Sequence, residues 1–458
     1  MKREPTASSS RTDAEARSWI HPGDAVEVVS FFAVELTAAQ NATLERRLSR
    51  GIMVSLALTG LAGILLVLSG SRYPEMGRAL VIAAAVGAAL RPWRLRELAL
   101  WSCSAAFFLA FLGVTVVAAR AANARRDPLP NLGNQVLSTH ESEAYLASKG
   151  VDPKKSHAVK TGIFLTHMEF ESSNNVAVSG YVWQIYPPDT PKELQKGVVF
   201  PEAVNGGYDD MQQAYDVTTP EGVQILGWHF DLTFRQRFDY AKYPFDQQDV
   251  WLRMWHRDFE QDAILIPDFE GYPPWVPSET IGLEKQFVYN GWSPMFTRFG
   301  YLENTYASTF GFGAYAPKPS FPEMVYTTSL RRLSTAPFVN HVLPLMVTYV
   351  LTFAILLFMV KDDERSFAIL SSLTGLFFLT LLNHQQINTV AAADGLSFLG
   401  LASGIMYLSF FGVAANGLAL ARLDIPFLEW RNNLLAKLLF LPVTSFVRAG
   451  ISVGILKA

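Results

Sequence analysis

Two patterns of hydrophobic positions divide this chain of 458 residues. Long apolar runs fall within residues 52–119 and again within residues 339–456. Between them, residues 127–333 contain no apolar run of the roughly 20 residues that a helix needs to cross a bilayer. Short stretches there alternate apolar and polar side chains, a period typical of half-buried β-strands. The pattern predicts a mixed membrane protein: an all-β aqueous domain between two groups of transmembrane helices.

The first group contains three apolar segments: Ile52–Gly70, Ala79–Leu90 and Leu98–Ala119. The outer two are long enough to span, whereas the middle one spans only in a tilted or thinned bilayer. Upstream, Ala25–Ser49 carries one apolar stripe, which predicts either an amphipathic helix on the membrane surface or a solvated helix. We expect a tail over residues 1–50 and a three-span module over residues 51–122.

The second group contains four apolar segments: Val339–Val360, Ser366–Leu382, Leu396–Leu420 and Leu434–Leu456. Pro442 and Arg448 interrupt the last segment, which either crosses the membrane or lies in its interface. We expect these segments to form a four-span membrane domain over residues 336–458.

The aqueous domain is expected over residues 123–335. Frequent turn dipeptides separate the strands of an immunoglobulin-like β-sandwich there. The predicted strands are Gly162–Phe170, Val176–Ile185, Gln224–Arg235, Val250–Trp255, Ala263–Pro267, Val288–Tyr301 and Met324–Leu330, with a short helix over Glu141–Lys149 before them.

Composition narrows the chemistry. Half of the residues are hydrophobic and only 17% are charged, below the about 25% of soluble domains, so the lipid bilayer is a partner. The net charge of −3 gives no case for nucleic acid. The single cysteine, Cys103, excludes an intramolecular disulfide and a cysteine-based zinc site, and we expect no cofactor. His256 and His229 have no nucleophile at a defined spacing, so we expect surface histidines and no enzyme.

The distribution of arginine predicts the orientation. Arg46, Arg47 and Arg50 precede the first span, and another basic cluster lies between the second and third spans. Positive charge accumulates on the cytoplasmic side of membrane proteins, so the N-terminus is expected inside and the β domain outside.

The stretch Phe238–Phe259 carries a family resemblance. Its Tyr243-Pro244-Phe245-Asp246-Gln247-Gln248 lies between two alternating strands, about 95 residues before an apolar helix with a proline near its start. It resembles the signature loop of the pentameric ligand-gated ion channels, the Cys-loop receptor superfamily, in its prokaryotic form without the signature cysteines. Further segments resemble the family in the same order: Trp183 in the second strand, Trp255-His256-Arg257, Asn290-Gly291-Trp292, Leu330-Arg331-Arg332 and Leu343-Pro344-Leu345.

Two departures accompany the resemblance. A proline that often follows the second span of the channel domain is missing from Asn388–Asp394. The three N-terminal spans have no counterpart in the basic plan of the family. The resemblance covers about two thirds of the chain, from Thr161 onward, and implies a homopentamer in a bacterial inner membrane with a periplasmic β domain.

The resemblance implies that five copies of Ser366–Asn383 line a pore. Two faces of this helix are alternatives for the pore lining. One comprises Phe367, Ser371, Thr374, Phe378 and Leu381; the other comprises Ser366, Leu370, Leu373, Phe377 and Thr380. We favour the second, because polar ends around an apolar middle suit a dewetting gate. A ring of Glu364 would concentrate permeant cations. The alternative for Glu364 is a charge pair that anchors the turn. The alternative for the whole segment is a helix used only for packing.

The resemblance also implies a ligand site between subunits and a coupling loop. The ligand-site candidates are Trp183, Trp255, Phe310, Phe312 and Tyr315, whose rings suit a small amine through cation–π attraction, unless they fill the core. The coupling candidates are Tyr243, Pro244, Phe245, Asp246 and Arg331, which should face the Asn383–Asp394 linker. The expected function is a ligand-gated, cation-selective channel. The alternative is a non-conducting receptor or scaffold that signals through its N-terminal spans.

Overall fold

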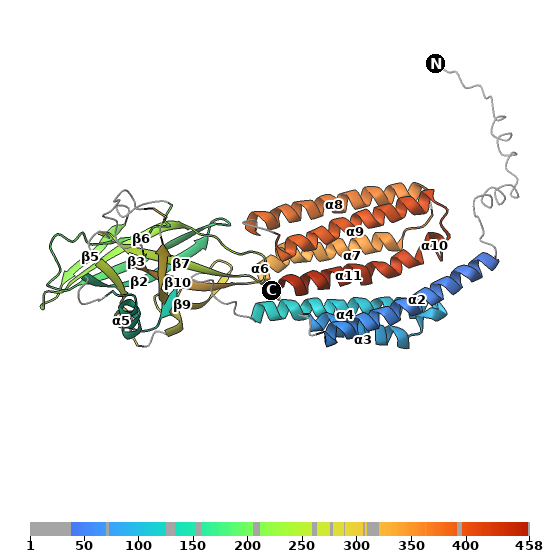
Figure 1. Cartoon of the computed structure of the whole chain (residues 1–458). Helices are drawn as coiled ribbons and strands as arrows, with labels where there is room; N and C mark the ends of the chain where they lie inside the picture. The colour runs from blue at the N-terminus through green and yellow to red at the C-terminus, as the bar shows by residue number, and fades with distance from the viewer. Residues whose placement is uncertain are drawn as a thin grey trace, which may run out of the picture.

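The computed structural model places the β domain at one end of an elongated molecule and the helices at the other (Figure 1). The structure describes residues 38–69, 73–124, 133–151, 157–204, 211–258, 263–274, 278–287, 289–305, 307–308, 320–361, 363–391 and 396–456. The side chains of residues 38–40, 305, 320–321 and 363–367 are outside that description.

Helices α2 (Ala38–Leu68), α3 (Pro74–Ala89) and α4 (Glu97–Ala124) precede the β domain. Within the described residues, five helices of the chain are long and apolar enough to cross a membrane, and α2 and α4 are two of them. The expected middle span is absent from that group. Its 16 residues reach only about 24 Å, short of the roughly 30 Å hydrocarbon core.

Helix α2 is continuous through the expected boundary at residues 50 and 51. Residues 38–49 therefore belong to the same helix as the first span, rather than to a separate amphipathic helix. The first part of the expected amphipathic segment, residues 25–37, lies outside the described residues.

Helix α3 packs against α2 through glycines. A Cβ atom on Gly63 would lie 2.7 Å from the Gly77 carbonyl oxygen, and one on Gly77 would lie 2.8 Å from the Gly63 carbonyl oxygen. Such close backbone contact is typical of helices that associate within membranes, where small residues permit tight packing. The short α3 is therefore kept in position by its packing against α2.

The β domain contains two five-stranded sheets (Figure 1). The first has the strand order β1-β9-β10-β7-β4 and the second β5-β6-β3-β2-β8. The strands are β1 (Asn134–Val136), β2 (His157–Phe170), β3 (Asn175–Tyr186), β4 (Val198–Val199), β5 (Gln212–Thr218), β6 (Gln224–Arg235), β7 (Gln247–His256), β8 (Ala263–Pro267), β9 (Trp292–Thr305) and β10 (Ser320–Arg332), and helix α5 spans Thr139–Ser148. Pairing is antiparallel except between β2 and β8. All seven predicted strands and the short helix are confirmed within a few residues.

The domain core follows the predicted alternation. Phe230, Leu232 and Phe234 of β6 are buried, as are Val250, Leu252 and Met254 of β7, whereas Asp231, Arg253 and Trp255 are more exposed. Because successive side chains of a strand point to opposite faces, each sheet has one apolar face. The buried faces of both sheets contribute to one core cluster.

The chain after β10 forms the second helical group. Its elements are α6 (Thr335–Pro337), η6 (Phe338–Val342), α7 (Leu343–Leu357), α8 (Asp363–Ala391), α9 (Phe398–Arg422), α10 (Pro426–Glu429) and α11 (Leu434–Leu456). The segments that contain α7, α9 and α11 meet the length and hydropathy of a membrane span within the described residues. Helix α8 has 29 residues but combines its apolar middle with a charged start and a polar end, so the group has three to four apolar helices. Leu434–Leu456 is one continuous helix despite Pro442.

The two helical groups pack side by side along α4 and α11. The rings of Phe111 and Phe446 lie 5.2 Å apart, edge to face, and Ala118 belongs to the same apolar cluster as Ala449 and Val453. Figure 1 shows that α8 lies on the opposite side of the bundle from α2, α3 and α4, with α7, α9 and α11 between them.

Candidate functional site

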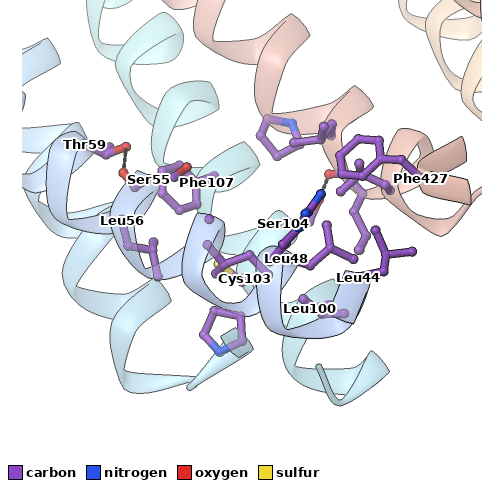
Figure 2. A pocket seen from close by; sticks show the side chains of 18 of the residues that line it. Leu44, Leu48, Ser55, Leu56, Thr59, Leu100, Cys103, Ser104, Phe107 and Phe427 are labelled. Atoms are coloured by element: carbon purple, nitrogen blue, oxygen red, sulfur yellow. Dashed lines mark hydrogen bonds between the residues drawn. The ribbon is translucent and has the colours of Figure 1, made fainter. Parts of the chain in front are cut away.

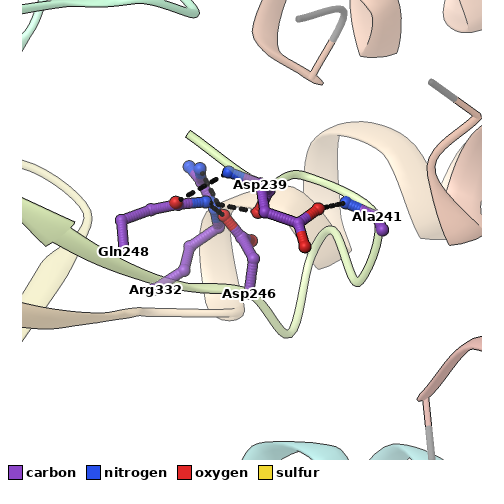
Figure 3. Close-up of polar contacts among 5 residues, drawn as sticks. All are labelled: Asp239, Ala241, Asp246, Gln248 and Arg332. Carbon is purple, nitrogen blue, oxygen red and sulfur yellow. Dashed lines mark hydrogen bonds and ion pairs between the residues drawn. The ribbon is translucent and has the colours of Figure 1, made fainter. Parts of the chain in front are cut away.

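The best-defined polar contact near the helices joins Asp246, in the loop before β7, to Arg332, the last residue of β10. Arg332 Nε lies 2.7 Å from Asp246 Oδ1, and its Nη2 lies 3.0 Å from Oδ2 (Figure 3). The Arg332 backbone N–H also donates to the Asp246 carbonyl oxygen at 3.2 Å. Two parallel charge-assisted bonds hold a guanidinium and a carboxylate in one plane. Since Asp246 is buried, this pair fixes the loop to the strand that leads into the membrane helices.

Gln248 joins the pair to the other side of the loop. Its Nε2 donates to Asp246 Oδ2 at 2.9 Å and to the Asp239 carbonyl oxygen at 2.7 Å, while its Oε1 accepts from the Asp239 N–H at 3.2 Å (Figure 3). The Asp239 carboxylate in turn accepts from the Ala241 N–H at 2.8 Å. The loop is therefore a rigid, hydrogen-bonded unit.

Aromatic rings surround the Arg332 guanidinium. Its central carbon lies 4.1 Å from the ring centre of Trp292, 5.0 Å from that of Tyr243 and 5.9 Å from that of Tyr240. Burial raises the pKa of both tyrosines to about 12, so their phenols stay neutral. The positive charge is therefore held by one carboxylate and three ring faces.

The loop continues to the membrane helices through Tyr243. Its ring centre lies 6.1 Å from that of His341, in η6 immediately before α7. His341 contacts Asn383 of α8 twice: Nδ1 lies 3.3 Å from Oδ1, and Asn383 Nδ2 donates to the His341 carbonyl oxygen at 3.1 Å. Tyr243, His341 and Asn383 thus form a contiguous path from the β domain to α8.

A second contact joins the loop to α9. The Phe398 N–H donates to the Ala241 carbonyl oxygen at 2.8 Å, and the rings of Phe245 and Phe398 lie 6.4 Å apart. The loop thus contacts the start of α9 directly and reaches Asn383, the first residue of the expected linker, through His341. Residues 392–395 of that linker lie outside the described residues.

The arginine that meets the loop differs from the predicted one. Arg331 was the expected coupling residue, but Arg332 binds Asp246. Neighbouring residues of a strand point to opposite faces, so only one of two consecutive arginines can reach the loop. Sequence alone offered no means of choosing the register.

The two described ligand-site candidates lie on different sheets. Trp183 of β3 belongs to the second sheet, and Trp255 of β7 belongs to the first. Phe310, Phe312 and Tyr315 lie outside the described residues. Within one chain, Trp183 and Trp255 do not share a strand pair.

Local contacts occupy Trp183. Its Nε1 donates to Asp268 Oδ2 at 2.8 Å, and its ring centre lies 5.4 Å from that of Tyr272. The ring also covers Gly162 of β2, where a Cβ atom would lie 2.1 Å from Trp183. The ring remains partly exposed on the outer side of its sheet.

Trp255 lies beside a largely buried charge cluster. The Arg253 guanidinium carbon lies 5.5 Å from the Trp255 ring centre. Arg253 pairs with Glu202 and also with Glu323, at 2.9 Å from Nη1 to Oε2. Loss of hydration on burial raises the pKa of Glu202 despite the neighbouring arginine. The cation–π contact that we expected from a ligand is thus made, on this ring, by the protein's own arginine.

The burial of α8 separates the two candidate pore faces. Leu373 and Thr380 are buried inside the bundle, and Phe377 packs against Tyr407 and Phe410. Leu370 is the most exposed described member of the favoured face. The other face has exposed side chains at Ser371, Thr374 and Phe378, with Leu381 partly exposed. The favoured face therefore packs largely within the subunit. Glu364 and Ser366 belong to the first turn of α8, but their side chains lie outside the description.

A buried network near β7 escaped sequence reasoning. His256 is buried, contrary to the expected surface position. Its Nδ1 accepts from the Asp258 N–H at 3.1 Å, and its Nε2 lies 3.2 Å from the Tyr186 hydroxyl. Gly197 N–H donates to Gln184 Oε1 at 3.0 Å, and Tyr186 donates to the same oxygen. Strict alternation through Val250, Leu252 and Met254 was the available signal, because it places residue 256 on the buried face.

No protein-family model and no curated protein matches this chain. Among the described residues, no three His, Cys, Asp or Glu side chains are grouped to hold a metal ion.

Proposed function

We propose that this protein is a pentameric ligand-gated ion channel with helices added at its N-terminus. The observation that carries the proposal is the continuous contact from Asp246–Arg332 through Tyr243 and His341 to Asn383 of α8. A ligand that alters the conformation of the β domain can act on α8 only through contacts between the two parts. This path supplies such contacts. Residues 123–335 would then be the ligand-binding domain and residues 336–458 the channel domain.

The position of α8 supports its assignment as the pore helix. It lies at the side of the bundle remote from α2, α3 and α4 (Figure 1), and its exposed residues follow one face. Around a fivefold axis, that face would meet its copies, and the added helices would lie outside, toward lipid. We assign the pore to the face of Ser371, Thr374 and Phe378, with serine and threonine hydroxyls and one ring along the path.

Cation selectivity is assigned to Glu364, at the end of α8 remote from the β domain. Five carboxylates around an axis attract cations and repel anions. The ligand site is placed between subunits, with Trp255 from one subunit and Trp183 from the next, because the two belong to opposite sheets. A small amine is the ligand class, with Phe310, Phe312 and Tyr315 as further candidates.

Ion flux into vesicles that contain the purified full-length protein tests the proposal. Candidate amines should open a sodium or potassium flux, and Glu364→Gln should reduce the preference for cations over chloride. The matched control is Glu143→Gln, an exposed carboxylate on α5 in the β domain. Absence of flux with every amine tested would contradict the proposal.

One observation favours a second function, a non-conducting receptor. The N-terminal helices pack intimately on α11, where Ser104 Oγ donates to the Leu438 carbonyl oxygen at 2.7 Å. A conformational change in the bundle would therefore reach α4 directly. A pentamer that binds a ligand without passing ions would favour this function.

A further inference from the structure

A cavity of about 1080 Å³ lies between α2, α4 and the α10–α11 segment (Figure 2). These parts of the helices lie at the end of the molecule remote from the β domain (Figure 1). Its walls are chiefly aliphatic and aromatic, among them Leu48, Leu56, Leu100, Phe107 and Phe427. Small-molecule sites commonly enclose about 300–1,000 Å³, so this cavity has room for a large ligand. Helices α2 and α4 contribute much of its lining, and these helices have no counterpart in the basic plan of the channel family.

The cavity has the length of a lipid chain site. Along α2 its lining extends from Thr43 to Thr59. At the helical rise per residue, this corresponds to about 24 Å, most of the hydrocarbon thickness of a bilayer. Its lining on α11 includes Leu438 and Pro442, so it reaches the part of the helix that Ser104 contacts.

One arginine, Arg47, lies at one end of the cavity, and further arginines lie nearby on α2. Arg47 contributes to the lining, and the exposed Arg46 and Arg50 belong to the adjoining turns of α2. On the other side of α2, Arg46 and Arg50 join Arg94 and Arg431 around a second hollow of about 540 Å³. Clustered arginines beside the start of a span indicate the cytoplasmic side.

Together, these features specify one ligand chemistry. An apolar cavity inside the membrane accepts acyl chains, and arginine recognises phosphate through parallel hydrogen bonds. Basic pockets between helices on the cytoplasmic side are known to suit anionic lipid head groups. A protein segment as occupant would bury a backbone that needs hydrogen-bond partners, and the hydroxyls of the lining are few.

We propose that this cavity binds an anionic glycerophospholipid of the cytoplasmic leaflet, with an acyl chain between α2, α4 and α11 and the phosphate at Arg47. The bound lipid would attach the N-terminal helices to the bundle. The site depends on none of the channel assignments above and can be measured without ion flux.

The test measures lipid retained by the full-length protein. The protein is delipidated, incubated with vesicles of phosphatidylcholine alone or mixed equally with phosphatidylglycerol, and re-isolated, and the lipids bound per subunit are counted by native mass spectrometry. Wild type should retain phosphatidylglycerol in preference to phosphatidylcholine. Arg47→Gln should reduce that preference about fivefold, the effect of one basic residue near an anionic surface. Arg120→Gln, at the other end of α4, is the control.

A second variant blocks the cavity itself. A Cβ atom on Gly51 meets no atom within 4 Å, so Gly51→Phe can place its ring in the cavity without moving the helix. It should abolish retention of both lipids. Gly113→Phe on α4 is the matched control, because Gly113 also has open space and lies outside the lining. If Gly51→Phe does not fold, Gly51→Leu serves the same purpose.

Two results would overturn the proposal. Equal retention of the two lipids by wild type would remove the head-group specificity. Unchanged retention in Gly51→Phe would show that the lipid lies elsewhere and that the cavity is filled by another occupant, such as residues of the chain before α2 or a second copy.

Discussion

Asp246 and Arg332, 86 residues apart in the chain, form a two-point ion pair whose carboxylate is buried. One partner belongs to the loop between β6 and β7, and the other ends the strand that leads into the membrane helices. The pair therefore fixes the position of the loop relative to the helices. In the proposed channel, this contact is one of the points through which a movement of the β domain reaches the membrane helices.

Removal of the arginine charge should destabilise the protein strongly. Arg332→Gln leaves Asp246 as a buried carboxylate without its partner, and breaking buried pairs in this way costs about 3–5 kcal/mol. Unfolding of the full-length protein in denaturant, followed by tryptophan fluorescence, measures the loss. The adjacent Arg331→Gln is the matched control and should cost about 1 kcal/mol or less, a typical effect of a single substitution. Equal losses in the two variants would show that Arg332 has no special role.

The hydroxyl of Ser104 should stabilise the contact between α4 and α11. Pro442 has no N–H, so the Leu438 carbonyl four residues earlier lacks its usual helical donor, and Ser104 supplies one. Ser104→Ala should therefore destabilise the helical part by about 1 kcal/mol. Thermal unfolding of the full-length protein measures this, with Ser102→Ala as the control.

A double-mutant cycle isolates the mechanism of that effect. In a Pro442→Ala background, the helix regains its own N–H donor to Leu438, so Ser104→Ala should cost much less there. Additive losses from the two substitutions would mean that Ser104 acts independently of the proline.

The β domain should become less stable as the pH falls below neutral, because of His256. Burial lowers its pKa from the ordinary 6.5, and a proton on Nδ1 would oppose the Asp258 N–H that this atom accepts. As pH falls through 6.5, the unfolded chain binds the proton first. The stabilisation is thus complete above 6.5 and decreases below it, by at most about 1.4 kcal/mol per pH unit.

Variants separate His256 from other titrating groups. His256→Gln should reduce this pH dependence in denaturant unfolding, whereas His140→Gln, at an exposed position of α5, should leave it unchanged. An unchanged slope in His256→Gln would contradict the assignment.

Thiol accessibility should distinguish the two faces of α8. With Cys103 replaced by alanine, Ser371→Cys and Phe378→Cys should react with a charged, water-soluble thiol reagent, because these positions face outward. Leu373→Cys should react much more slowly, since its side chain is buried in the bundle. Fast reaction at Leu373 and none at Ser371 would restore the face of Leu370, Leu373 and Phe377 as the pore lining.

Local periodicity predicted most of the fold. The alternation in Phe230–Phe234 and in Val250–Met254 depends only on which side chains meet the core, and the structure agrees with it. The short strands β1, β4 and β5 were missed: β1 and β4 have too few residues to show a period, and β5 is exposed throughout. Helix α3 was overestimated as a span because the apolar run does not show where its helix ends, and its 16 residues are too few to cross the hydrocarbon core.

The candidate site was only partly predictable. The aromatic and acidic character of Tyr243–Asp246 was visible, but the choice between Arg331 and Arg332 depends on strand register. The face of α8 that packs inward depends on α9, because Tyr407 and Phe410 contact Phe377. The arginine that meets the loop and the inward face of α8 are both set by tertiary contacts. The sequence does not specify these contacts, because the two faces of the helix have similar hydrophobicity.

The number of subunits tests the central proposal most directly. Full-length protein in mild detergent should form particles with fivefold symmetry in electron micrographs, with α8 closest to the axis and α2–α4 at the rim. A monomer, a dimer or a ring of another order would contradict the channel proposal, whatever ligand the β domain binds.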